Sequence, residues 1–340
     1  MGLVVKDLFK KYGDKVVVDH ISFEIPKPGV YALLGSNGAG KSTSIRMILG
    51  MLEKSGGEVT WNGGPLNFDT CNIGYLAEER GLYPKYSLMD QIKYFGELRG
   101  VSGKTLTDRI AYWAERLKVE EYLYPEKAAA MEAEARKESL AAQGIVEEST
   151  TGSFAVKKKP KPKTADQLSK GNQQKIQFLI ALLSDPELLV LDEPFSGLDP
   201  VNADILKEVV REQIARGKYI IMSSHQMEVV EEFCTDITIL HRSKVVLSGN
   251  LNDIKKSFGR VNLGLKCEQD VSDIIKACGV EILTEKENEY TLRVTGDEQA
   301  NQLLKSLIEK NAKVVRFDLS ELSLHEIFVR EVGDEVSETK

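Results

Sequence analysis

A glycine-rich stretch between an apolar run and a helical pattern constrains the fold more than any other part of the sequence. It consists of Gly35, Ser36, Asn37, Gly38, Ala39, Gly40, Lys41, Ser42 and Thr43. This order fits G-x-x-x-x-G-K-[ST], in which glycines let successive backbone N–H groups turn inward around an anion. The run Val30–Gly35 indicates a buried strand, and the stretch from Lys41 to about Met51 indicates a helix whose positive end faces the turn. The sequence therefore predicts a phosphate-binding turn between a strand and a helix.

A second apolar run ends in two carboxylates and complements this turn. Lys41 is expected to reach the β- and γ-phosphates of a nucleotide, and Ser42 to offer its hydroxyl to Mg²⁺. The run Leu188–Leu191 indicates a buried strand that delivers Asp192 and Glu193 at its end. Asp192 can hold Mg²⁺ through water, and Glu193 can polarise an attacking water molecule. The carboxylate pair is a weak signal alone and a strong one beside a phosphate-binding turn.

Short apolar runs alternate with helical patterns along most of the chain, which predicts an α/β fold with a largely parallel sheet. Helical patterns are expected at 87–118 and 173–183, and Pro200 is expected to open a further helix. The run 219–224 indicates a buried strand. The runs at 3–13 and 15–25 indicate a strand pair, and those at 236–242 and 244–249 indicate a pair near a sheet edge. The sheet is expected to have an antiparallel edge. From about residue 261 strands and helices of a small α+β domain follow, to about 335.

Composition excludes few function classes. The 340 residues carry 45 basic and 52 acidic side chains, a net charge of −7, so nucleic acid is not expected as the main partner. The sequence contains no run of about 18 apolar residues, so no membrane span is expected. The four cysteines form no CxxC pair and are expected to be small core residues in a reducing cytosol. They are Cys71, Cys234, Cys267 and Cys278.

Together these motifs resemble the nucleotide-binding subunit of an ABC transporter, over residues 1 to about 250. The stretch Leu168–Gln174, LSKGNQQ, is similar to the family signature LSGGQ. The resemblance implies that this turn closes on ATP held by the other subunit of a dimer. Ser169 and the Gly171 backbone would then touch the γ-phosphate. Lys170 and Asn172 depart from the commonest pattern, at positions where the pattern is permissive.

The resemblance also assigns roles to residues outside these motifs. Ser196–Asp199, SGLD, matches the turn that links the two sites of the dimer, and it includes Asp199 as a site residue. His225, which follows the strand YIIMSS, matches the switch histidine that senses the γ-phosphate. Tyr12 matches the aromatic residue that stacks on adenine, with an ordinary surface tyrosine of a strand as the alternative. The remaining histidines are expected to be structural.

One position departs from most of the family. In IGYLAEER, Glu78 stands where most relatives carry glutamine. A carboxylate there can still bind Mg²⁺ or orient water, so the sequence leaves the effect of Glu78 open. The stretch EERGLYPK resembles the branch that includes the sodium-extrusion ATPase NatA and its drug- and peptide-exporting relatives, where glutamate is usual. The segment SLHEIFVR near the C-terminus is similar to the small domain of that branch. The resemblance therefore points to export and leaves the exported substance open.

The fold class that follows is an α/β, ABC-type P-loop ATPase with an antiparallel β edge. The domain organisation implied is a nucleotide-binding domain at 1–250, with a helical subdomain at about 85–180, and an accessory α+β domain at 261–335. The resemblance implies an ATP hydrolase that uses ATP and Mg²⁺ at the cytoplasmic face of the membrane. Its partners would be a separate transmembrane permease and a second ATPase subunit, in a homodimer or a heterodimer.

A permease-free ABC ATPase, of the translation or DNA-repair type, is the alternative. Translation factors of the family join two cassettes, whereas one set of motifs is found here. Repair ATPases separate the phosphate loop from the signature by long coils, which a short insertion does not supply. A nonenzymatic nucleotide sensor is a third possibility, against which Lys41, Asp192, Glu193 and His225 all argue.

Residues 125–163 are predicted to be an insertion in the helical subdomain. The first part is rich in alanine and glutamate and indicates a helix. The second part has few apolar residues and a lysine- and proline-rich run, 157–163, which indicates a segment without a packed core. Three interpretations stay open: a solvated surface extension, a docking or regulatory element, or a contact with lipid or nucleic acid.

Overall fold

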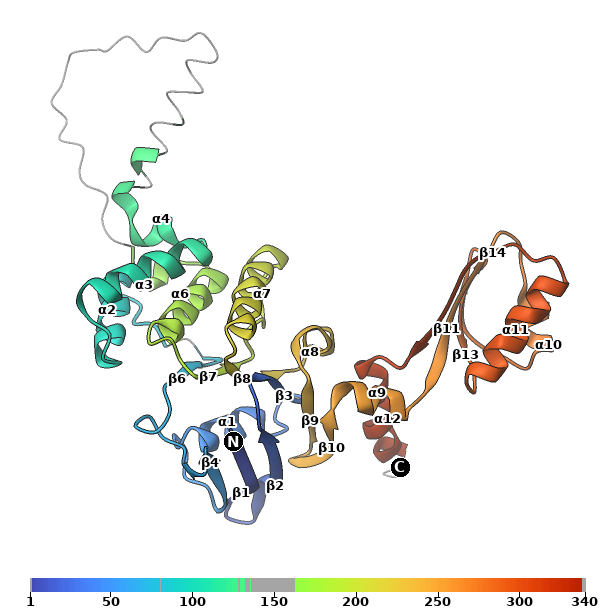
Figure 1. Ribbon diagram of the computed structural model, residues 1–340, viewed down its shortest axis with the longest axis horizontal. Coiled ribbons are helices and arrows are strands. Elements are labelled where there is room, and N and C mark those ends of the chain that lie inside the picture. The colour runs from blue at the N-terminus through green and yellow to red at the C-terminus, as the bar shows by residue number, and fades with distance from the viewer. Residues whose placement is uncertain (1, 80, 128, 132–134, 136–162, 338–340) are drawn as a thin grey trace, which may run out of the picture. The chain divides into compact units, whose positions relative to one another are not determined.

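The computed structural model describes residues 2–79, 81–127, 129–131, 135 and 163–337 (Figure 1). The chain divides into two compact units, each built from several chain segments. The first unit comprises Met1–Lys10, Ser22–Val30 and Ser42–Ser224. The second comprises Lys11–Ile21, Tyr31–Lys41 and His225–Lys340. Residues 35–41 of the phosphate-binding turn therefore belong to the second unit. Ser42, Thr43 and the strand that carries the two carboxylates belong to the first.

Parallel strands form the central part of the first unit. They are β6 (Ile73–Leu76), β7 (Leu188–Asp192) and β8 (Tyr219–Ser224), with β7 paired to both others. All five residues of β7 are buried, as expected for a strand with both faces covered. The register places Asp192, the last residue of β7, opposite Ser223, the residue before the last of β8. The strands predicted at 188–191 and 219–224 are confirmed.

Antiparallel strands form the other sheet region of the first unit. β1 (Leu3–Tyr12) pairs antiparallel with β4 (Gly56–Trp61), and β4 pairs antiparallel with β5 (Gly64–Pro65). Buried and exposed residues alternate along much of β1, which matches a strand with one face on the core. The antiparallel edge expected from the sequence is present.

The helices of the first unit follow the predicted pattern with one break. The patterned region 87–118 forms two helices, α2 (Leu88–Leu98) and α3 (Gly103–Arg116), where one continuous helical pattern was expected. The break falls at Gly100, which has φ of +76°, a left-handed conformation that ends a helix without the steric cost of a Cβ. The other helices are α1 (Lys41–Ile48), α4 (Glu120–Leu123), α6 (Lys170–Leu182) and α7 (Pro200–Ala215), with a 3₁₀ turn η1 (Ala165–Gln167).

In the second unit, β3 (Gly29–Gly35) pairs parallel with β9 (Asp236–His241). β10 (Lys244–Asn250) pairs antiparallel with β9, as predicted for this pair, and parallel with β2 (Lys15–Ile25). The predicted position of this pair near a sheet edge is wrong, because each of the two strands has a further neighbour in the sheet. Two short helices flank β9 and β10 in the chain, α8 (Met227–Phe233) and α9 (Leu251–Ser257). The sequence analysis did not predict either helix, because seven residues give too short a window for a helical period.

The C-terminal part of the second unit contains a four-stranded antiparallel sheet of order β12-β13-β11-β14. Its strands are β11 (Arg260–Cys267), β12 (Glu281–Lys286), β13 (Glu289–Arg293) and β14 (Val314–Glu321). Figure 1 shows α10 (Ser272–Ala277) and α11 (Asp297–Glu309) beside this sheet, and their apolar side chains join those of the strands in one buried cluster. The last helix is α12 (Leu324–Ser337). The strands and helices expected here are confirmed, whereas the domain boundaries themselves stay a prediction.

Most of the predicted insertion, 125–163, lies outside the described residues. Among the described residues, none of the helices has the length and apolar character needed to cross a bilayer.

Gly74 in β6 gives a direct test of this packing. A Cβ on Gly74 would lie 2.5 Å from the carbonyl oxygen of Ala181 in α6 and 2.9 Å from Pro186 Cγ. We therefore expect Gly74→Ala to lower the free energy of unfolding by about 1–3 kcal/mol, the usual cost of overpacking. Gly64→Ala is the matched control, because the atom nearest to a Cβ on Gly64 is the carbonyl oxygen of Trp61, at 3.8 Å. Urea or thermal unfolding measures the difference, and equal stability of the two variants would contradict the packing.

Candidate functional site

Two glycines allow the phosphate-binding turn to lie against its neighbours. Gly35 has φ of +150°, and a Cβ there would lie 2.3 Å from the carbonyl oxygen of Leu240. Gly40 has φ of +107°, and a Cβ there would lie 2.6 Å from the carbonyl oxygen of Val17. Since a side chain fits at neither position without moving a backbone, both glycines are required by the fold of the turn.

Lys41 begins α1 and is buried. Its Nζ donates hydrogen bonds to the carbonyl oxygens of Gly35 at 2.8 Å and Ser36 at 3.4 Å. The N–H of Ala39 donates to Ser36 O at 3.1 Å, which closes the turn. The ammonium group is thus held at the turn, together with the first N–H groups of α1, as a phosphate site requires. Of the other predicted turn residues, Asn37 and Gly38 are exposed.

Asp192 is the centre of the site in the first unit. It is fully buried at the end of β7, and its Oδ1 accepts hydrogen bonds from Ser42 Oγ at 3.1 Å and Ser223 Oγ at 2.5 Å. Ser223 Oγ in turn accepts a hydrogen bond from the backbone N–H of Glu193 at 2.9 Å. One hydroxyl group therefore fixes both the carboxylate of Asp192 and the backbone of Glu193.

The donor set of Asp192 and Ser42 fits Mg²⁺. Asp192 Oδ2 is buried and has no hydrogen-bond partner among the described residues, so one carboxylate oxygen is left for a ligand. Mg²⁺ prefers oxygen ligands and usually takes only one or two from the protein, the others coming from phosphates and water. Burial raises the pKa of Asp192, and the hydrogen bonds from Ser223 and Ser42 counteract that rise.

Glu193 follows directly in a strained conformation. Its φ is +50°, unusual for a residue with a side chain and of a kind that costs about 1–3 kcal/mol. Besides the hydrogen bond to Ser223, the turn is held by Gln174 from α6, whose Nε2 donates to Pro194 O at 2.6 Å and Glu193 O at 3.4 Å. The predicted signature helix thus contacts the backbone that carries the predicted water-polarising carboxylate.

The predicted signature turn begins α6. Ser169 is the N-cap residue, and its Oγ accepts a hydrogen bond from the N–H of Asn172 at 3.3 Å. A Cβ on Gly171 would lie 3.0 Å from Asn202 Nδ2 and 3.2 Å from Leu198 Cδ2. Glycine at 171 therefore permits close approach of α6 to the start of α7. Ser169 itself is exposed, as a residue that contacts a second subunit must be.

Asp199 caps α7 at the other side of this contact. Its Oδ1 accepts a hydrogen bond from Asn202 N at 3.0 Å, and its Oδ2 accepts one from Asn202 Nδ2 at 2.6 Å. These hydrogen bonds lower the pKa of Asp199. Pro200 occupies the first turn of α7, as predicted. The structure thus brings the predicted signature and the Ser196–Asp199 turn together in the first unit.

Glu78 is exposed two residues beyond β6. Its charge is felt by Tyr75, whose pKa is raised by burial, by Asp192 and, less strongly, by Glu78. A hydrogen bond from Arg46 acts against this rise. The charges of Asp192 and Glu78 both act on Tyr75, and the role of Glu78 stays a prediction.

Tyr12 and His225 lie where their predicted roles require access. Tyr12 ends β1 with 54 % of its surface exposed, enough for a ring to stack on it. His225 is exposed in the turn between β8 and α8. The roles of both residues stay predictions.

Sequence reasoning missed Ser223. The only signal was a serine at the end of a buried strand, and such a residue becomes informative only when the pairing of β7 with β8 is known.

The fold and this site define a P-loop ATPase class, and comparison with known proteins gives the family. Residues 18–196 match the model of the ABC transporter family, and residues 249–332 match the model of the ATP-binding protein DrrA1-3-like, C-terminal domain. The chain is 37% identical over 332 residues to the uncharacterized ABC transporter ATP-binding protein YhaQ of Bacillus subtilis, covering 97% of this chain and 98% of that protein.

Two further comparisons agree. The ABC transporter ATP-binding protein NatA of Bacillus subtilis is 29% identical over 268 residues, covering 75% of this chain and 92% of NatA. A solved structure described as the ATP binding subunit of an ABC transporter is 27% identical, with a TM-score of 0.59, covering 76% of this chain and 93% of that one. The chain therefore belongs to the ABC transporter ATP-binding proteins, as an ATP-binding ATPase with a large mixed sheet.

The hydrogen bond from Ser223 gives a test by pH. Because this bond favours the ionised form of Asp192, Ser223→Ala should raise the pKa of the carboxyl group further. Asp192 would then be protonated at higher pH, so the acid limb of Mg²⁺-dependent ATP hydrolysis should move to higher pH. Rates measured between about pH 5 and 8 show the shift. Ser223→Thr keeps the hydroxyl group, so its acid limb should lie at the pH of the wild-type limb. An acid limb that does not move in Ser223→Ala would contradict the proposed effect of Ser223 on Asp192.

Proposed function

We propose that the chain is the ATP-hydrolysing subunit of an ABC exporter, and that it drives a separate membrane permease at the cytoplasmic face of the membrane. The observation that carries this proposal is the arrangement at the end of β7, where Ser223 fixes Asp192 and Glu193 while Ser42 from α1 contacts Asp192. A protein that only sensed nucleotide would have no need of a buried carboxylate aligned with a second one.

Nucleotide binding uses the phosphate-binding turn and the start of α1. The N–H groups of the turn and the ammonium of Lys41 neutralise the phosphates, and Lys41 exchanges its carbonyl partners for phosphate oxygens. Tyr12 offers its exposed ring to adenine. Ser42 and Asp192 would hold Mg²⁺, which neutralises charge on the β- and γ-phosphates.

Hydrolysis then falls to residues near the γ-phosphate. Glu193 accepts a proton from the attacking water, and the hydrogen bonds from its N–H to Ser223 and from Gln174 to Pro194 O hold the backbone that carries it. His225 donates a hydrogen bond to the γ-phosphate. Glu78 would either bind Mg²⁺ or orient the attacking water. In a dimer, the exposed Ser169 at the start of α6 contacts the γ-phosphate bound by the other subunit.

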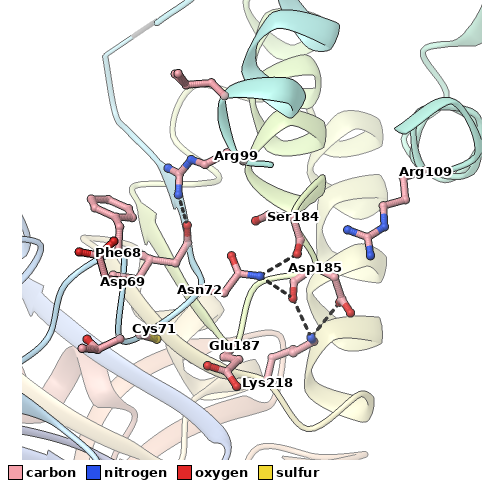
Figure 2. Close-up of a pocket in the computed structure, with 13 residues that line it drawn as sticks. Phe68, Asp69, Cys71, Asn72, Arg99, Arg109, Ser184, Asp185, Glu187 and Lys218 are labelled. Atoms are coloured by element: carbon pink, nitrogen blue, oxygen red, sulfur yellow. Dashed lines mark hydrogen bonds and ion pairs between the residues drawn. The ribbon is translucent and has the colours of Figure 1, made fainter. Parts of the chain in front are cut away.

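A groove in the first unit suits the permease. A cavity of about 1140 Å³ lies where the end of α2 faces the loops before β6 and β7. Figure 2 shows Arg99 beside Phe68, with its Cζ 4.7 Å from the ring centroid and its Nη1 donating to Ile73 O at 2.7 Å. A second cavity, lined by Tyr75 and residues of α6, shares Arg99 with the first. Because Phe68 and Leu98 are exposed at this groove, it offers apolar contacts to a permease loop.

The general-base role is tested by Glu193→Gln. The amide keeps the size of the side chain but cannot accept the proton, so ATP hydrolysis should fall roughly 10²–10⁴-fold while ATP binding is retained. Trapped ATP should also yield a dimer in size-exclusion chromatography with Mg²⁺. Glu58→Gln, an exposed residue of β4, is the matched control. Undiminished hydrolysis together with an unchanged monomer would rule out the proposed role.

The permease contact is tested by Leu98→Glu. A carboxylate on this exposed residue would be desolvated by a docked loop, so association with membranes from the source organism should decrease at least about tenfold, a loss of about 1.4 kcal/mol. Basal ATP hydrolysis should be unchanged, because Leu98 lies outside the nucleotide site. Ile308→Glu, which alters an exposed apolar residue of α11, is the matched control. Equal sedimentation of both variants with membranes would exclude this groove as the docking surface.

A further inference from the structure

The turn that carries His225 leads into a helix whose position depends on its contacts. α8 has seven residues and begins two residues after His225. Its N-cap residue, Gln226, makes no side-chain capping hydrogen bond. A helix this short is not stable by itself, so packing and hydrogen bonds from neighbouring elements determine where it lies. Whatever holds α8 therefore also holds one end of the His225 turn.

Glu231 connects α8 to the last helix of the chain. Its Oε1 accepts a hydrogen bond from the backbone N–H of Leu324, the first residue of α12, at 2.7 Å. The same oxygen accepts one from Lys255 Nζ of α9 at 3.1 Å. The first N–H groups of a helix have no partner within it and carry partial positive charge, so a carboxylate is the favoured acceptor there.

The first turn of α12 is bound on its other side to the C-terminal sheet. Glu326 accepts hydrogen bonds from the N–H and Oγ of Ser323 at 2.9 and 2.8 Å, and the N–H of Glu326 donates back to Ser323 Oγ at 3.2 Å. Glu326 also accepts from Asn262 Nδ2 of β11 at 2.7 Å and from Arg293 Nη2 of β13 at 3.3 Å.

The pKa of Glu326 is consistent with a carboxylate that is held ionised by these hydrogen bonds. Burial would raise the pKa of Glu326, but the hydrogen bonds from Ser323 and Asn262 outweigh burial and hold the pKa below its usual range. Farther along α12, the Arg330 guanidinium lies 5.4 Å from the ring centroid of Phe258, just after α9. α12 is therefore fixed to the sheet by Glu326 and to α8 and α9 by Glu231 and Arg330.

We propose that Glu231 is a positioning residue that couples the C-terminal sheet to the His225 turn. The chain of contacts runs from β11 and β13 through Glu326 to the first turn of α12, and from there through Glu231 to α8. A displacement of the sheet is transmitted to α8 and changes how His225 meets the γ-phosphate. This inference rests on the proposed role of His225 in hydrolysis.

Kinetics of the full-length chain test the coupling. Glu231→Ala should lower kcat about fivefold or more, the usual lower range for coupling between sites. It should leave ATP affinity unchanged, because the hydrogen bonds described for Glu231 go to α9 and α12. Glu231→Gln keeps a carbonyl oxygen as acceptor for Leu324 and should recover part of the rate. Glu228→Ala, an exposed glutamate of the same helix, is the matched control and should leave kcat unchanged.

A double-mutant cycle with His225→Ala shows whether Glu231 acts through the histidine. In the His225→Ala background, Glu231→Ala should have no further effect on kcat, because the group that it positions is gone. Equal rate losses in both backgrounds, or an unchanged kcat in Glu231→Ala, would overturn the proposal.

Amide hydrogen exchange tests the coupling between the C-terminal sheet and α8 independently of ATP hydrolysis. Arg293→Ala, which loosens Glu326 from the sheet, should speed amide exchange at 227–233, whereas Lys305→Ala on the exposed face of α11 should not. Unchanged exchange in Arg293→Ala would overturn the coupling even if hydrolysis falls. If the wild-type chain fails to hydrolyse ATP while Arg293→Ala still speeds exchange in α8, the proposed function fails and the contact chain stands.

Discussion

The site depends on two hydrogen bonds of the Ser223 hydroxyl group, one to Asp192 and one from the N–H of Glu193. A fully buried carboxylate such as Asp192 is costly unless hydrogen bonds compensate for lost water, and two hydroxyl groups provide them on one oxygen. The same Ser223 oxygen accepts the N–H of Glu193 and so stabilises a backbone conformation that a glutamate rarely adopts. The register of β7 with β8 makes this possible, because it sets Asp192 opposite Ser223. Packing of two buried strands thereby determines the geometry of the carboxylates.

Within each unit, a side chain joins two elements by hydrogen bonds to backbone groups. In the first unit, Gln174 of α6 donates to the backbone after Glu193, and Gly171 lets α6 approach Leu198 closely. α6 is therefore joined directly to the turn that carries Glu193. The second unit has a corresponding contact, in which Glu231 joins α8 to α12. In both cases a side chain binds backbone groups, so the link transmits position and is insensitive to the identity of the side chains that it meets.

The sequence predicted the parts of the site whose chemistry is local. The phosphate-binding turn requires glycines at Gly35 and Gly40, and that requirement is visible as a spacing in one segment. Asp192 and Glu193 follow a run whose apolar character alone indicates a buried strand. Ser223 and Glu231 were not found, because each acquires its partners from segments distant in the chain. For the same reason the sequence predicted strands and helices of the C-terminal region but not the hydrogen bonds that join α12 to α8.

Glu78 gains meaning from its neighbours in the structure. Asp192 and Glu193 already place two carboxylates together, and the Glu193 charge contributes to the raised pKa of Asp192. The charges of Asp192 and, less strongly, Glu78 both raise the pKa of Tyr75. Arg46 is the cation that opposes this field from α1, and its contact with Glu79 is long, at 4.0 Å between half-exposed and exposed side chains. Glutamine in place of Glu78 would remove one negative charge, so glutamate makes the site depend more strongly on a divalent cation for charge balance.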